Sequence, residues 1–144
     1  MIKVICVGKL KENYLKEGIN DYLKRINKYH KIEIIELADS NIVDEGKEIL
    51  KHIDTKDYLI AMCIEGENIS SKELAMKIDK TFITHPCITF IIGGSDGISE
   101  DIKNKCNYRL SFSKLTYPHG LFRIILLEQI YRSFKILNHE TYHK

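Results

Sequence analysis

Side chains able to do chemistry are concentrated in the last third of the chain. The turn Gly93-Gly94-Ser95-Asp96-Gly97 follows one β-type run, and Ser111-Phe112-Ser113-Lys114-Leu115-Thr116-Tyr117-Pro118-His119 closes the next. Glycines permit positive φ and let backbone amides approach a ligand closely. Because open α/β folds bind ligands at the carboxyl ends of their strands, the two segments predict one ligand site. The alternatives are a turn that needs glycine for geometry alone and a capped helix start with Thr116 as N-cap.

The C-terminal segment Asn138-His139-Glu140-Thr141-Tyr142-His143-Lys144 supplies further groups that exchange protons or donate hydrogen bonds to anions. The alternative is a frayed tail without a function, because chain ends are usually poorly ordered.

Other familiar sites are missing from the sequence. The first β-type run ends in a lone Gly8 instead of G-x-G-x-x-G, and no P-loop, G-x-S-x-G or H-E-x-x-H motif occurs. The cysteines form no C-x-x-C pair, and we expect them to be reduced, small apolar residues. They are Cys6, Cys63, Cys87 and Cys106. The expectation is a protein without a metal.

Strand and helix patterns alternate along the chain, which predicts an α/β fold with a mostly parallel sheet covered by helices on both faces. The expected strands are Ile2–Val7, Ile32–Leu37, Tyr58–Ile64, Ile88–Ile92 and Tyr108–Ser113. The expected helices are Glu12–Asn27, Asp44–Ile53, Ser70 to about Phe82 (opened by an S-x-x-E capping box), Ser99–Asn107 and Leu121–Leu137. No linker or repeat interrupts this order, so residues 1–144 are expected to form one domain.

The last expected helix, Leu121–Leu137, is apolar nearly all round. It is either buried under neighbouring elements, or it packs one side on its own sheet and another on a second copy of the protein. We favour the homodimer, because a small domain has little protein left to cover two faces.

Composition is that of an ordinary soluble protein, with 44% apolar and 29% charged residues in 144. No apolar run is long enough to cross a membrane, and the N-terminus lacks a signal-peptide pattern, so a cytoplasmic location is expected. Residues 103–144 contain eight Lys or Arg against two acidic residues. This surplus suggests a polyanionic partner at one face, although solvated basic faces are common.

Taken together, these segments resemble the RlmH family, the small stand-alone SPOUT-class methyltransferases of large-subunit ribosomal RNA. The resemblance covers essentially the whole chain. It is carried by Val7-Gly8-Lys9-Leu10-Lys11, Ile64-Glu65-Gly66, Phe90-Ile91-Ile92-Gly93-Gly94-Ser95-Asp96-Gly97, Leu110 to His119, Glu128-Gln129-Ile130-Tyr131-Arg132 and Tyr142-His143-Lys144. It implies a homodimer with a C-terminal trefoil knot, which transfers a methyl group from S-adenosylmethionine to N3 of a pseudouridine in a 23S rRNA stem-loop at the ribosomal subunit interface.

The resemblance also implies roles for individual residues. Those expected to line the S-adenosylmethionine pocket are Met62, Gly93, Phe112, Ser113, Lys114, Leu115, Thr116 and Tyr117. Those expected to orient the base, take its proton or stabilise its charge are Tyr142, His143, His119, Arg123 and Arg132. This chain departs from the family at Met62, where relatives usually have Leu, at Gly120, where many have Gln, and at Thr141, where Pro or Ala is common.

Two other functions compete with this interpretation. A dimeric α/β module that binds S-adenosylmethionine or RNA without catalysis would have the same fold. A doubly wound nucleotide-binding enzyme would instead place its ligand after the first strand, near Gly8.

Overall fold

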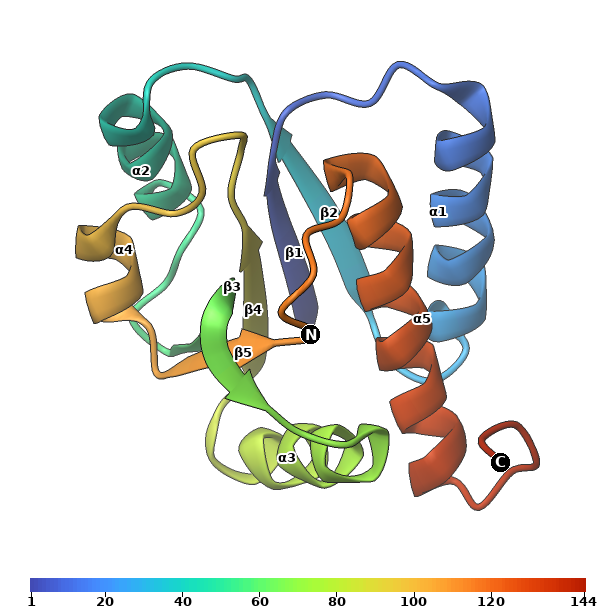
Figure 1. The fold of residues 1–144 in the computed structure, drawn as a ribbon. Helices are drawn as coiled ribbons and strands as arrows, with labels where there is room; N and C mark the ends of the chain where they lie inside the picture. Colours follow the sequence, from blue (N-terminus) through green and yellow to red (C-terminus); the bar gives the residue numbers. More distant parts are fainter.

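The computed structural model describes all of residues 1–144, and it confirms the predicted α/β fold (Figure 1). The strands are β1 Ile2–Val7, β2 Ile32–Leu37, β3 Asp57–Asn68, β4 Cys87–Ile92 and β5 Tyr108–Ser111. The helices are α1 Asn13–Asn27, α2 Ile42–Leu50, α3 Ser71–Thr84, α4 Glu100–Lys105 and α5 His119–Leu137. The strands form a single parallel sheet in the order β2-β1-β4-β3-β5.

Helices cover both faces of the sheet, as predicted. On one face α5 lies between α1 and α3 (Figure 1), and their apolar residues form the larger core cluster with one side of the strands. On the other face, Ile49 of α2 and Ile102 of α4 pack on a smaller cluster that includes Ile5 and Ile91. β4 is buried at all of its positions, as expected for a β-branched strand at the centre of a parallel sheet.

The capping box at the start of α3 is present. The Ser70 hydroxyl accepts from the Glu73 amide at 3.1 Å, and the Glu73 carboxylate accepts from the Ser70 amide at 3.0 Å. Both bonds satisfy amides that a helix N-terminus would otherwise leave unpaired.

β3 is longer than predicted, and its extension matters for the site. Met62 and Glu67 both pair with Leu110 of β5, so β3 bulges between these two positions. The polar residues beyond Ile64 gave no alternating pattern, which is why the sequence did not predict this part of the strand. β3 lies between β4 and the edge strand β5, and beyond the bulge it pairs only with β5.

All four cysteines are free thiols, with Cys6 and Cys87 buried. No helix is long and apolar enough to cross a membrane. Nowhere do three His, Cys, Asp or Glu side chains come together as a metal would require.

Candidate functional site

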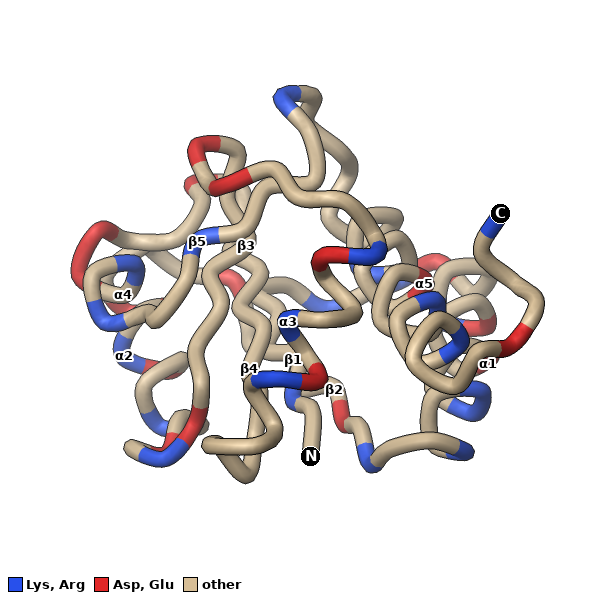
Figure 2. Tube along the Cα trace, turned by 90° about the horizontal axis from the view of Figure 1, so that it is seen from below, with Lys and Arg blue, Asp and Glu red and all other residues tan.

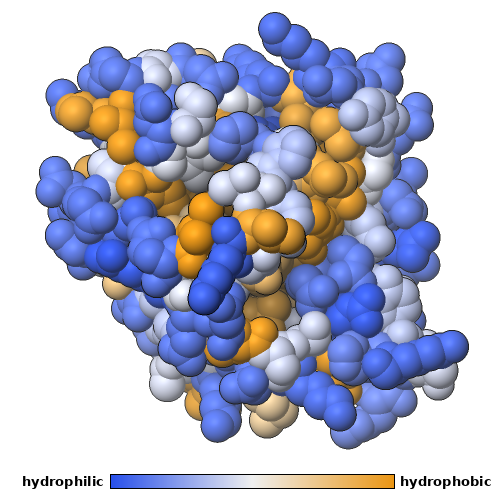
Figure 3. Space-filling model, viewed as in Figure 1, coloured by the Kyte–Doolittle hydropathy of each residue, from blue (hydrophilic) through white to orange (hydrophobic).

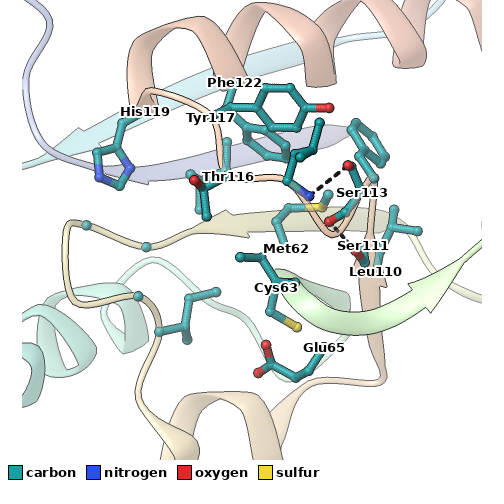
Figure 4. Close-up of a pocket in the computed structure, with 18 of the residues that line it drawn as sticks. Met62, Cys63, Glu65, Leu110, Ser111, Ser113, Thr116, Tyr117, His119 and Phe122 are labelled. Carbon is teal, nitrogen blue, oxygen red and sulfur yellow. Dashed lines mark hydrogen bonds between the residues drawn. The ribbon is translucent and has the colours of Figure 1, made fainter.

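The two irregular segments of the last third meet at one cavity of about 370 Å³ (Figure 4). They do not follow neighbouring strands, because β3 lies between β4 and β5. The end of β3 therefore contributes as well, and its residues Met62 to Glu65 line the cavity between the two connections. The size is that of a small-molecule site.

The turn after β4 forms one wall and depends on two glycines. A Cβ on Gly93 would lie 2.4 Å from the carbonyl carbon of Gly97, so no side chain fits there. Gly97 has a φ of 79° and donates its amide to the carbonyl of Gly94 at 3.0 Å. The turn thus exposes backbone to the cavity without intervening side chains.

The segment after β5 forms the opposite wall. The Ser111 hydroxyl donates to the carbonyl of Ser113 at 3.0 Å, and the Ser113 hydroxyl accepts from the Leu115 amide at 2.9 Å. The rings of Phe112 and Tyr117 lie 5.6 Å and 5.9 Å from the ring of Phe122 in α5. These contacts hold an aromatic wall suited to a flat apolar group.

Seven of the eight residues expected in the cofactor pocket line this cavity. The exception is Lys114, which is exposed in the loop and does not line it. His119, expected near the chemistry, also lines the cavity at the start of α5. The alternative of Thr116 as N-cap is wrong, because Pro118 occupies that position and no side chain caps the helix.

The cavity also contains polar residues that the sequence analysis did not assign. Glu65 lies with Cys63 on the side opposite Tyr117 and Phe122 (Figure 4). Lys103 of α4 donates a hydrogen bond to Glu65, which lowers the pKa of the carboxyl and raises the pKa of Lys103. Glu65 is in a motif that carried the resemblance, whereas nothing in the sequence marked Lys103, because only the packing of α4 brings it to β3.

Arg123 lies apart from the cavity, with only 1% of its surface exposed. It donates to the Glu36 carboxylate at 2.7 Å and to the carbonyls of Val7 and Gly8 at 3.2 and 2.6 Å. The guanidinium therefore fastens α5 to the carboxyl ends of β1 and β2. It also lies against Gly8, where a doubly wound nucleotide enzyme would hold its ligand.

Arg132, Tyr142 and His143 come together at the other end of α5. The Glu128 carboxylate accepts from the Arg132 Nε at 2.9 Å and from the Tyr142 hydroxyl at 3.2 Å, and Arg132 Nη1 lies 3.0 Å from His143 Nδ1. Lys135 pairs with Glu140 at 2.8 Å. The tail is thus fastened to α5 and is not frayed.

Within one protomer this cluster and the cavity are far apart. His119 and Arg132 are separated by roughly 20 Å along the helix axis, at the ordinary rise per residue. The predicted catalytic residues therefore fall into three places: His119 at the cavity, Arg123 in the core, and Arg132, Tyr142 and His143 at the tail.

Most of the positive charge of the last third is paired locally. Five of its eight cationic side chains form ion pairs with carboxylates, namely Lys103, Arg109, Arg123, Arg132 and Lys135. Figure 2 accordingly shows basic and acidic residues next to each other over much of the trace. The surplus does not form one continuous basic face.

Comparison with known proteins places this fold in a class. A solved structure, the SpoU methyltransferase AviRb from Streptomyces viridochromogenes, superimposes with a TM-score of 0.50 over 98% of this chain and 62% of its own, at 12% sequence identity. At this identity the likeness concerns the fold alone, which is that of a SpoU-type methyltransferase.

The family follows from sequence. The family model described as "Predicted SPOUT methyltransferase" matches residues 1–143. Proteins named ribosomal RNA large subunit methyltransferase H from Clostridium botulinum strain Kyoto (type A2) and strain Hall (type A) are 46% and 45% identical, each over 99% of both chains. The chain belongs to the SPOUT methyltransferase family.

Proposed function

We propose that this protein methylates large-subunit ribosomal RNA, with S-adenosylmethionine as methyl donor and N3 of a pseudouridine in a 23S rRNA stem-loop as acceptor. The observation that carries the proposal is the convergence of the glycine turn and the segment after β5 on one cavity. The relatives at 46% and 45% identity support the RNA substrate through their names. Since ribosomes are the substrate, the protein acts in the cytoplasm.

The cavity suits the methyl donor. Its aromatic and aliphatic side would receive the flat adenine, with Met62 and Phe122 among the contacts, and the exposed backbone of the glycine turn and of residues 112–117 would donate and accept hydrogen bonds. The Glu65 carboxylate and the serine hydroxyls provide the few polar groups that such a ligand needs. When bound, the donor supplies an activated methyl group on a sulfonium.

The protein's own contribution is to align the reacting atoms and to stabilise the negative charge of the acceptor base. Holding the sulfur, methyl carbon and acceptor nitrogen in line supplies much of the acceleration. The pseudouridine N3 is an imide that must lose its proton before or during attack, and a nearby cation favours its anionic form. Arg132 is the cation that the tail cluster provides.

The distance along α5 indicates that two protomers build the site together. In a twofold dimer with antiparallel α5 helices, the tail of one protomer would lie beside the cavity of its partner. Apolar side chains are exposed over the first half of α5 (Figure 3), where Leu121 is 43% exposed and Ile125 is half-buried. We therefore propose a homodimer in which α5 lies at the interface and residues 142–144 act across it.

RNA recognition would rely on shape more than on charge. Of the cationic residues in the last third, Lys114 lies exposed in the loop next to the cavity and forms none of the ion pairs found in this structure. With so little free charge, we expect whole ribosomes or large subunits to be much better substrates than an isolated stem-loop. Equal turnover on the isolated stem-loop would contradict this. Lys114→Ala should weaken ribosome binding and leave cofactor binding unchanged.

The resemblance implies a C-terminal trefoil knot, which we retain as a proposal for the single domain of residues 1–144. It is supported by the chain path, since β5 is an edge strand whereas α5 packs at the middle of one face. An experimental density map that traces residues 93–119 continuously would test it.

Deletion of residues 142–144 tests the function directly. We expect calorimetry to show unchanged S-adenosylmethionine binding and methyl incorporation into ribosomes to fall by at least about 100-fold, because the acceptor base would no longer be held in line with the methyl group. Nucleoside mass spectrometry of the wild-type product should show a methylated pseudouridine. A wild-type protein that binds the cofactor but transfers no methyl group would favour the non-catalytic binding module.

A further inference from the structure

The tail cluster has a carboxylate at its centre. Arg132 donates to Oε1 of Glu128 through Nε at 2.9 Å and Nη2 at 2.5 Å, and the Tyr142 hydroxyl donates to the same oxygen at 3.2 Å. The Glu128 side chain is 18% exposed, so these charge-assisted bonds lie partly away from water. Two side chains, Arg132 and Tyr142, thus depend on Glu128 for their orientation.

Glu128 is itself held from the adjacent helix. Its second oxygen accepts from the Gln129 amide at 3.1 Å, and Gln129 in turn accepts from the Ser71 hydroxyl of α3 at 2.7 Å. A carboxylate fixed in this way can direct its partners, because its own position does not adjust to them.

The contact between Arg132 and His143 determines which ring nitrogen carries the proton. A guanidinium has donors only, so Nδ1 of His143, 3.0 Å from Nη1, must accept. An imidazole that accepts at Nδ1 has its hydrogen on Nε2. In this form His143 offers a donor to a base carbonyl, and its acceptor nitrogen is already occupied.

The Tyr142 hydroxyl also acts as a hydrogen-bond donor. Its hydroxyl bonds to Glu128, and its ring meets Tyr131 edge-on at 5.0 Å and lies under the Arg132 guanidinium, also at 5.0 Å. Burial, followed by the charge of Glu128 and by Tyr22 of α1, raises the pKa of Tyr142 to about 12. A hydroxyl in these surroundings does not take a proton near neutral pH.

We propose that Glu128 is a positioning residue that aims Arg132 and Tyr142 and, through Arg132, keeps His143 as a neutral hydrogen-bond donor. The proposal rests on the methyl transfer proposed above. In this arrangement Tyr142 and His143 orient the pseudouridine, while the charge of Arg132 stabilises the imide anion, whose proton leaves to solvent. Neither tail side chain acts as a general base.

The first test compares Glu128→Gln with Asp21→Asn. Asp21 forms the same i, i+4 pair with an arginine, Arg25, but on α1 and with both side chains about half exposed. We expect Glu128→Gln to lower methyl transfer by about 10- to 100-fold with S-adenosylmethionine affinity retained, Glu128→Asp to recover part of the rate, and Asp21→Asn to match the wild type. Wild-type turnover in Glu128→Gln, or a loss that merely follows cofactor affinity, would overturn the proposal.

Two further measurements use the wild-type protein and so do not depend on whether a variant folds. Nitrogen-15 NMR should show His143 protonated on Nε2, and an Nδ1-protonated ring would contradict the assignment.

The groups facing His143 and Tyr142 are Arg132, Glu128, Tyr131 and Tyr22. The logarithm of the methylation rate should rise steadily through neutral pH, whereas an inflection near about 6.5 would indicate a histidine base. If the wild type transfers no methyl group, the proposed function fails, while the NMR result still tests the cluster.

Discussion

At the scale of single residues, two glycines of the turn after β4, Gly93 and Gly97, are required for different reasons. Gly93 has no room for a side chain, because backbone atoms of Gly97 and Ile98 lie within 2.8 Å of the position a Cβ would take. Gly97 has open space around it, but its φ of 79° is a backbone conformation that residues with a side chain rarely adopt. Both glycines line the cavity, but only Gly93 lacks the space for a side chain.

Alanine substitutions should separate these constraints. Gly93→Ala must push backbone aside, so we expect a loss of about 1–3 kcal/mol in the free energy of unfolding and at least about 10-fold weaker S-adenosylmethionine binding. Gly97→Ala should cost about 1–2 kcal/mol through its φ and leave cofactor affinity within a few-fold. Urea unfolding and calorimetry measure both. Equal cofactor affinity in the two variants would contradict the role assigned to the turn.

At the scale of elements, α5 connects the cavity with the cluster around Glu128. Its first turn gives His119 and Phe122 to the cavity, its middle is buried, and its end carries the cluster around Glu128. The first turn can sit this deep because position 120 is glycine. A Cβ there would lie 2.6 Å from Leu15 and 2.7 Å from Leu10. Glycine at this position, which departs from the resemblance, therefore has a packing reason in this chain.

Gly120→Ala should lower the free energy of unfolding by about 1 kcal/mol, because the terminal methyl groups of Leu10 and Leu15 must move to admit the added methyl group. The double variant Gly120→Ala with Leu10→Ala should lose less than the sum of the single losses, since removing the leucine side chain makes room. Strict additivity in urea unfolding would show that the methyl group is accommodated elsewhere.

At the scale of the whole molecule, a stabilising ion pair lies at the amino end of the sheet, opposite the cavity at its carboxyl end. Lys3 of β1 pairs with Asp57 of β3 at 2.7 Å, and the Thr89 hydroxyl of β4, between them, donates to Asp57 at 3.1 Å. Burial alone would raise the pKa of Asp57, but the hydrogen bonds from Lys3, the Asp54 amide and Thr89 outweigh it and hold this pKa below its ordinary value of 3.8. Three strands are thus joined at their amino ends.

This pair predicts a dependence of stability on pH. Because the folded-state pKa of Asp57 is depressed, its contribution is fully present above the ordinary value of 3.8 and is lost as the pH falls through the lower folded-state pKa. Asp57→Asn should cost about 3 kcal/mol at neutral pH, since it leaves Lys3 without its partner. The difference from the wild type should shrink below about pH 4 in urea unfolding. A difference that is constant down to pH 2 would contradict the assignment.

Mixing two inactive variants tests whether the site is shared between protomers. Gly93→Ala is expected to lack a working cavity and the chain without residues 142–144 to lack the tail, so neither homodimer should methylate ribosomes well. After exchange of subunits, a mixed dimer would hold one complete site, and activity should return to about a quarter of the wild type. A mixture that stays inactive although mass spectrometry shows mixed dimers would mean that the tail acts within its own chain.

The sequence by itself determined the fold class and the walls of the site. The period-2 and period-3.6 apolar patterns, the Ser70 capping box and the glycine turn are local signals, because each follows from residues a few positions apart. The segment from Ser111 to His119 was found for the same reason: it closes a β-type run, and strand ends in a parallel sheet meet at one edge.

Only the tertiary structure decided which distant groups meet. Lys103 reaches Glu65 because α4 packs beside β3, and Arg123 is in the core because Glu36 and the carbonyls of Val7 and Gly8 accept from its two Nη atoms there, although its buried Nε has no partner. The structure also separates the tail from the cavity by the length of α5. Such contacts depend on strand order and helix packing across a hundred residues, which no local pattern records.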